Sequence, residues 1–145
     1  MITPLRHLLA AACLFFGASA FANDPQPTLA ADEAARLAKE WLAHVDAGEY
    51  AQSWKEAAAR FKANVTEDKW VGAMTQVRQP LGAASERTLL DAAFTNDAPR
   101  APKGDYWIVK FSTRFEAIAA HEHITLTREA DGSWKVVGFF IRPAG

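Results

Sequence analysis

The feature that most constrains the fold of this chain is a change in the spacing of its apolar residues near position 80. Before that point apolar residues recur every three or four positions, and after it they alternate with polar ones. The first spacing is typical of amphipathic helices and the second of half-buried strands. Helices followed by a sheet make an α+β fold, so this is the predicted fold class.

Three helices are expected in the first half of the chain. Apolar stripes run through residues 34–45 and 50–65, and Gly48 between them is a natural stop. Thr66 suits the N-cap of a third helix, which Pro80 ends. We expect the three helices to pack on one face of the sheet.

Four strands are expected in the second half, over residues 86–94, 106–115, 120–129 and 134–142. A loop rich in proline and glycine, "TNDAPRAPKGD", separates the first two strands, and Asp131-Gly132 is typical of a hairpin turn. Consecutive strands joined in this way predict a four-stranded antiparallel meander.

The first 22 residues have the pattern of a secretory signal peptide. Arg6 precedes an apolar run, and Ala20-Phe21-Ala22 is a small-x-small cleavage site that places the mature start at Asn23. A retained membrane anchor and a lipoprotein through Cys13 are the alternatives. Cleavage near Ala22 predicts a periplasmic or secreted protein.

Residues 23–29 then form a flexible lead-in, and residues 30–145 are expected to form one α+β domain. Loss of the leader removes one of 16 basic residues and the only cysteine, which leaves 15 basic against 17 acidic residues, a net charge of about −2. This balance gives no phosphate-binding surface, so nucleic acid is not an expected partner. No later apolar run is long enough to span a membrane.

The densest group of titratable side chains is the run His121-Glu122-His123. Alternation places both histidines on the polar face of the predicted sheet, with Lys110 and Arg114, and turns Glu122 inward. Two histidines at this spacing are weak candidates for a metal site, because a third ligand is missing and the cationic neighbours oppose a divalent ion. We therefore expect no metal and no cofactor.

Glu122 is the more informative residue, because a carboxylate turned into the core needs a partner. Arg78 and Arg87, at the junction between the last helix and the first strand, are the candidates. The cluster is either a structural ion pair or, alternatively, a general base or ligand anchor in a pocket between helices and sheet. Under both interpretations Glu122→Leu is predicted to change stability.

Four segments, "WLAHVDAGEYAQSWKEAAARFK", "W…VRQPLG…R", "GDYWIVKFSTRF" and "E.ITLTREADGSWKVVGFFIRP", resemble the bacterial domain-of-unknown-function family 4019. The resemblance covers nearly all of the predicted mature chain and implies a small exported domain, similar in layout to cystatin-like and nuclear-transport-factor-two-like folds. It supplies no reaction, and His121 and His123 are not part of the pattern. The matching positions include Trp54, Trp70, Arg78, Pro80, Leu81, Gly82, Arg87, Glu122, Gly132, Trp134, Gly138 and Arg142.

The sequence is compatible with two kinds of function. The first is a non-catalytic domain that binds a protein, a peptide or a small apolar ligand, since no catalytic motif is present. Alternation puts Val136 and Phe140 on one face of the last strand and Val137, Phe139 and Ile141 on the other, so a ligand, a partner or a second copy in a homodimer is expected to cover one face. The alternative is a small acid–base enzyme that uses Glu122, by analogy with other proteins of such folds.

Overall fold

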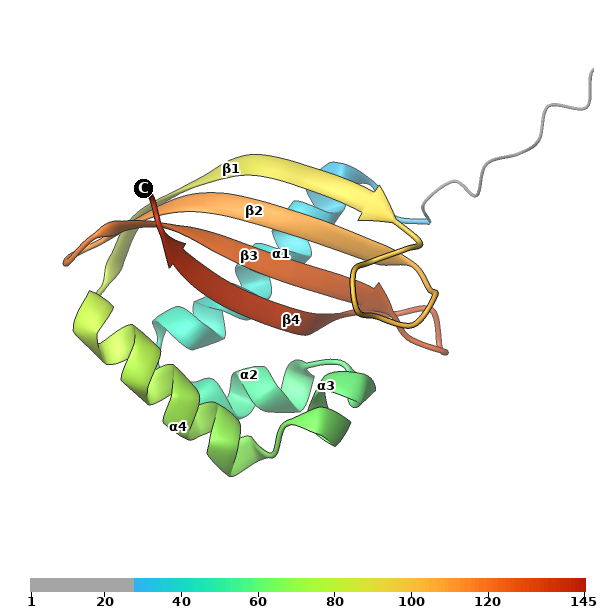
Figure 1. Ribbon diagram of the computed structural model, residues 1–145, viewed down its shortest axis with the longest axis horizontal. Coiled ribbons are helices and arrows are strands. Elements are labelled where there is room, and N and C mark those ends of the chain that lie inside the picture. Colours follow the sequence, from blue (N-terminus) through green and yellow to red (C-terminus); the bar gives the residue numbers. More distant parts are fainter. Residues whose placement is uncertain (1–27) are drawn as a thin grey trace, which may run out of the picture.

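The computed structural model describes residues 28–145; the predicted signal peptide and most of the predicted lead-in lie outside this range. Helices precede a four-stranded sheet in the chain, as the change of spacing predicts (Figure 1). The helices are α1 (Ala31–Asp46), α2 (Tyr50–Glu56), α3 (Ala59–Asn64) and α4 (Glu67–Arg78), followed by the 3-10 turn Gln79–Leu81. The strands are β1 (Ala84–Thr95), β2 (Tyr106–Phe115), β3 (Ala119–Arg128) and β4 (Trp134–Pro143).

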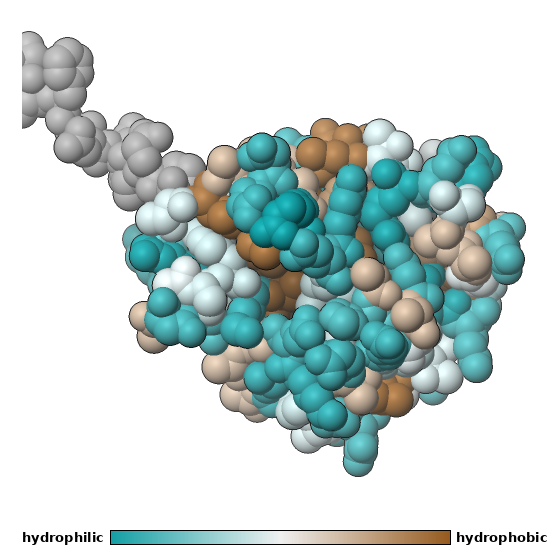
Figure 2. Space-filling model, turned by 180° about the vertical axis from the view of Figure 1, so that it is seen from behind, coloured by the Kyte–Doolittle hydropathy of each residue, from teal (hydrophilic) through white to brown (hydrophobic). Residues whose placement is uncertain are grey.

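The sheet is an antiparallel meander in the order β1-β2-β3-β4, which confirms the predicted α+β class. Helix α1 crosses behind the sheet in Figure 1, while α2, α3 and α4 lie below β4. One face of the sheet, called here the inner face, therefore packs on helices, and the opposite face is called the outer face. Seen from behind, the side that carries α1 is covered mainly by hydrophilic side chains (Figure 2).

The prediction of a single helix over residues 50–65 is wrong, because this segment forms two helices, α2 and α3. Ala57 and Ala58 separate them with extended ψ angles of 163° and 149°. The amide of Ala58 donates to the carbonyl of Val136 on the edge strand β4, at 2.7 Å, and both alanines are fully buried. A tertiary hydrogen bond to the sheet thus replaces a helical one, which the apolar spacing alone cannot reveal.

A β-bulge in β4 corrects the predicted faces of that strand. Leu126 pairs with Val136 and Thr125 pairs with Gly138, so Val137 is the extra residue. The bulge moves Val136 to the inner face, where it is 2% exposed, whereas alternation had placed it with Phe140. Phe140 remains on the outer face and is 45% exposed.

The core between helices and sheet is aromatic. The ring of Trp41 on α1 lies 5.4 Å from that of Phe139 on β4, and Phe61 on α3 meets Trp70 on α4 edge-on at 5.0 Å. The indole nitrogens of Trp41 and Trp70 both donate to the fully buried Ser53. Ser53 therefore satisfies two buried donors, and the core joins all four helices to the sheet.

The turn from α4 into β1 depends on Gly82, whose backbone (φ 74°, ψ −163°) is one that only glycine adopts readily. A Cβ here would lie 2.8 Å from Cβ of Glu116. We predict that Gly82→Ala lowers the free energy of unfolding in urea by at least about 1–3 kcal/mol. As the matched control, Gly72→Ala in the exposed interior of α4, with nothing within 4 Å, should raise it by about 0.5–1 kcal/mol. Equal effects of the two substitutions would contradict the assigned turn.

Candidate functional site

Glu122 lies on the inner face of β3 and is fully buried. Its Oε2 accepts hydrogen bonds from Nε of Arg87 at 2.7 Å and from Oγ1 of Thr113 at 2.5 Å, and its Oε1 accepts from Nη2 of Arg87 at 3.2 Å. The strand alternation that turns both neighbouring histidines outward is what directs this carboxylate into the interior. Both of its oxygens are therefore engaged by protein groups.

Arg87 on β1 joins two acids with one guanidinium. One edge of the group binds Glu122, and the other binds Asp46, from Nη1 to Oδ2 at 2.7 Å and from Nη2 to Oδ1 at 3.0 Å. Burial disfavours the charge of Arg87, but the hydrogen bonds from Asp46 and Glu122 outweigh burial and raise its pKa. Two-pronged binding of this kind needs the planar fork of arginine.

Arg78, the second candidate partner, does not reach Glu122. It is 5% exposed at the end of α4, and its Nη2 donates to Oδ1 of Asp46 at 3.1 Å. Its guanidinium carbon lies 4.6 Å from the centre of the Phe115 ring, in a cation–π contact. The structure thus brings Arg78, Arg87 and Glu122 into one cluster, with Asp46 as the link between the two arginines.

Sequence reasoning missed Asp46 and Thr113 as members of this cluster. Asp46 is the last residue of α1, where the helix dipole disfavours an acid, so an acid at that position is a sign of a cationic partner. Thr113 is the one hydroxyl in an otherwise apolar row on β2, which is a sign of a buried polar contact. The cluster ties the ends of α1 and α4 to three strands.

The histidines of the "HEH" run lie on the outer face, where His123 stacks on Phe140 with ring centres 4.4 Å apart. Burial lowers the pKa of His123, and the charges of Lys110, Arg142 and His121 lower it further. Among residues 28–145, no group of three or more His, Cys, Asp or Glu side chains is placed to hold a metal ion.

A hollow of about 920 Å³ opens on the outer face. Its floor is formed by β2, β3 and β4, one wall by the loop between β1 and β2, and the other by α3. Figure 1 shows this loop crossing in front of the sheet near the end of β3. The loop is held there because Tyr106 donates to the carbonyl of Pro102 at 2.7 Å and accepts from Arg60 of α3 at 2.8 Å. We call this space the outer-face hollow.

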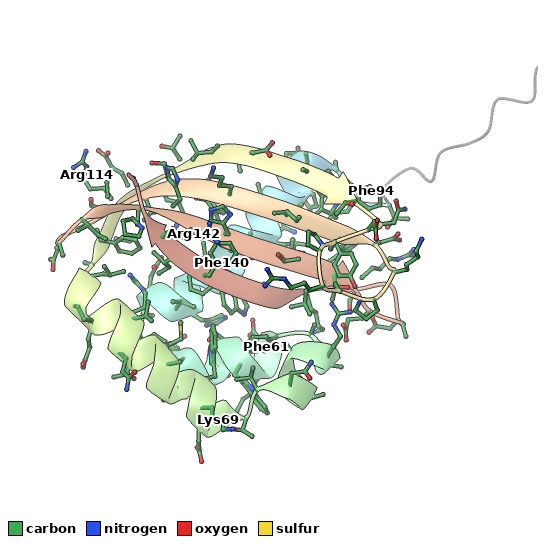
Figure 3. The ribbon with its side chains drawn as sticks, viewed as in Figure 1. Phe61, Lys69, Phe94, Arg114, Phe140 and Arg142 are labelled. Carbon is green, nitrogen blue, oxygen red and sulfur yellow. The ribbon has the colours of Figure 1, made fainter. Side chains whose placement is uncertain are left out.

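Phe140 and Arg142 of β4 lie on the floor side of the outer-face hollow, and Phe61 lies below them (Figure 3). Arg60, Arg100 and Arg142 line it together with His123, and no Asp or Glu of the described residues does. Glu122 lines neither this hollow nor either of two smaller cavities found in the same part of the chain. The outer-face hollow is therefore cationic and apolar, and it lies on the side of the sheet opposite the buried carboxylate.

The buried cluster predicts a large effect of removing Arg87. Arg87→Leu leaves Glu122 buried without a cation, so we expect the free energy of unfolding in urea to fall by about 3–5 kcal/mol. The double variant Arg87→Leu/Glu122→Leu should recover part of this loss, because no buried charge then lacks a partner. Arg36→Leu is the control, since Arg36 pairs with Glu33 and Glu40 at the surface and should contribute little. Equal unfolding midpoints for Arg87→Leu and Arg36→Leu would contradict the cluster.

Comparison with known families gives one result that covers most of the domain. Residues 37–139, from α1 to β4 and more than half of the 145 residues, match the family described as "Protein of unknown function (DUF4019)". A comparison with curated proteins gives no match. The matched span includes the buried cluster and most of the outer-face hollow. The chain belongs to the DUF4019 family, as the sequence resemblance predicts.

Proposed function

We propose that this chain is an exported, non-catalytic domain that binds a small, largely apolar molecule in the outer-face hollow. The observation that carries the proposal is the hollow itself. Its volume of about 920 Å³ lies within the range typical of sites for small molecules. It is bounded by a loop and a helix as well as by the sheet, which suits a compact ligand better than a flat protein surface.

The lining of the hollow supports an apolar ligand. Ile108 and Phe140 contribute to its floor, and Val65, Ala98 and Pro99 contribute to its walls. Phe140 lies on the edge strand β4 and is 45% exposed, so a large apolar ring is open to solvent at the hollow. A ligand seated here would bury that ring, and this burial would supply part of the binding free energy.

The alternative function, an acid–base enzyme that uses Glu122, has less support. A general base must reach the proton that it removes. Glu122 is fully buried, and both of its oxygens accept hydrogen bonds from Arg87, one of them also from Thr113. A structural role in joining helices to sheet accounts for these contacts without a substrate.

Export rests on the sequence pattern of residues 1–22, which lie outside the described residues. Within residues 28–145, no helix has both the length and the apolar character needed to cross a bilayer. A periplasmic or secreted location after cleavage near Ala22 agrees with the cysteine-free mature chain that the leader pattern predicts.

Binding in the hollow can be tested with the neutral fluorescent dye N-phenyl-1-naphthylamine and a blocking variant. Gly138 lies on the hollow floor, and a Cβ added there would meet Thr125 at an ordinary contact distance of 3.7 Å. Gly138→Leu should therefore fold normally and place a bulky side chain on the hollow floor, in the way of a ligand. We predict saturable dye fluorescence with the native chain and with Gly72→Ala, and its loss in Gly138→Leu. Undiminished dye binding by folded Gly138→Leu would place the ligand elsewhere and contradict the proposal.

The export proposal predicts the first residue of the mature protein. When the full chain is expressed in a bacterium with a periplasm, intact-mass measurement of the periplasmic fraction should find a protein that begins at Asn23. A substitution of Ala22 by a bulky residue such as Trp should block processing, because the cleavage site requires small side chains. Recovery of a full-length chain in the cytoplasm, with the leader uncut, would contradict export.

A further inference from the structure

We propose that the ligand of the outer-face hollow is an anion: a small molecule with an apolar body and a single carboxylate, sulfonate or phosphate group. The inference rests on the proposed function and deepens it by giving the charge of the ligand. Its basis is the arrangement of cations and aromatic rings around the hollow.

The charges that line the hollow are all of one sign. Arg60 comes from α3, Arg100 from the loop between β1 and β2, and Arg142 from β4, while no Asp or Glu among residues 28–145 lines the space. The whole chain, by contrast, has a net charge of −1. The cationic lining is therefore a local feature of this site, and a low-dielectric wall of apolar residues strengthens its attraction for an anion.

Two of these arginines are available to a ligand. Arg60 already donates to the hydroxyl of Tyr106 at 2.8 Å. Arg100 and Arg142 make no ion pair or hydrogen bond through their guanidinium groups within the described part of the chain, although most other arginines there do. Arg100 also has a φ of 61°, in the left-handed region that non-glycine residues seldom occupy. Arg142 on the floor and Arg100 on the loop wall thus each offer a guanidinium without a hydrogen-bond or ion-pair partner among residues 28–145, which can bind an anionic group.

The apolar and charged parts of the lining meet at Phe140. Its ring stacks on His123 at 4.4 Å with an interplanar angle of 14°, and the guanidinium carbon of Arg142 lies 4.8 Å from its centre. Figure 3 shows Phe140 and Arg142 adjacent on β4. An aromatic or aliphatic body against the exposed edge of the Phe140 ring would thus place an attached anionic group beside Arg142.

A second copy of the chain fits this surface less well. A two-fold interface centred on the hollow would set the same patch against itself. Arg60, Arg100 and Arg142 of one copy would then face the same cations of the other, without described acids in the lining to separate them. An anionic ligand has no such conflict.

A pair of dyes with the same ring system tests the charge of the ligand. 8-Anilinonaphthalene-1-sulfonate carries a sulfonate that N-phenyl-1-naphthylamine lacks. We expect the sulfonate dye to bind more tightly, and Arg100→Gln and Arg142→Gln each to weaken its binding about threefold to tenfold while changing the neutral dye little. Arg114→Gln is the matched control, because it removes the same charge from β2 outside the hollow. Added salt should weaken only the sulfonate dye.

Acidification should strengthen binding of the sulfonate dye, because the sulfonate stays charged while His123, whose pKa is lowered in the free protein, gains a proton as the pH falls below the usual histidine range. Burial and the positive neighbours hold His123 neutral in the free protein, and a bound anion would favour its charged form. His123→Gln should remove this pH dependence. The charged or titratable groups that face His123 or share the hollow with it are Lys110, His121, Arg142, Arg60 and Arg100.

Each outcome of the dye experiment decides one of the two proposals. If Gly138→Leu abolishes binding of both dyes but the sulfonate gives no advantage, the site stands and the anionic ligand is wrong. If Gly138→Leu changes neither dye, the site itself is wrong. If light scattering finds a dimer that Gly138→Leu dissociates, the hollow is an interface between copies and the small-molecule proposal fails. Preferential sulfonate binding that is lost in Arg100→Gln and Arg142→Gln, but kept in Arg114→Gln, supports both proposals.

Discussion

The interaction on which the rest of this structure depends is the bridge that Arg87 makes between Glu122 and Asp46. One guanidinium neutralises an acid in the middle of the sheet and an acid at the end of α1, and Asp46 in turn holds Arg78 at the end of α4. These contacts hold the C-terminal ends of α1 and α4 against β1, β2 and β3. Because the charges are largely buried, removal of one partner would leave an uncompensated charge in the interior.

The position of this bridge bears on the proposed binding site. A sheet that is covered by helices on one face usually offers a pocket between the two layers. Here the acid that could have served such a pocket is fully buried and bonded on the inner face. A smaller cavity between helices and sheet, lined by Trp41, Leu126 and Val136, does not include this acid. The outer-face hollow is larger, and there the loop between β1 and β2 and the short helix α3 form walls around Phe140. The buried charge cluster and the proposed binding surface are therefore on opposite sides of one sheet.

Much of the fold could be predicted from the sequence, because periodicity reports which side of an element is buried. The four strands, the Thr66 cap and the inward direction of Glu122 all follow from such local patterns. The break between α2 and α3 and the bulge at Val137 could not be predicted, since each depends on contacts between residues far apart in the chain. The outer-face hollow was missed for the same reason. A proline-rich loop gives no sign in its sequence of the sheet face that it will cover.

The most direct test of this account is a map of where a ligand contacts the protein. In a ¹H–¹⁵N correlation spectrum of the mature chain titrated with 8-anilinonaphthalene-1-sulfonate, we predict the largest shift changes at His123, Gly138 and Phe140. The amides of Asp46, Arg87 and Glu122, across the sheet, should change least. Shift changes centred on the buried bridge, with the outer face unchanged, would contradict the assignment of charge cluster and binding site to opposite faces.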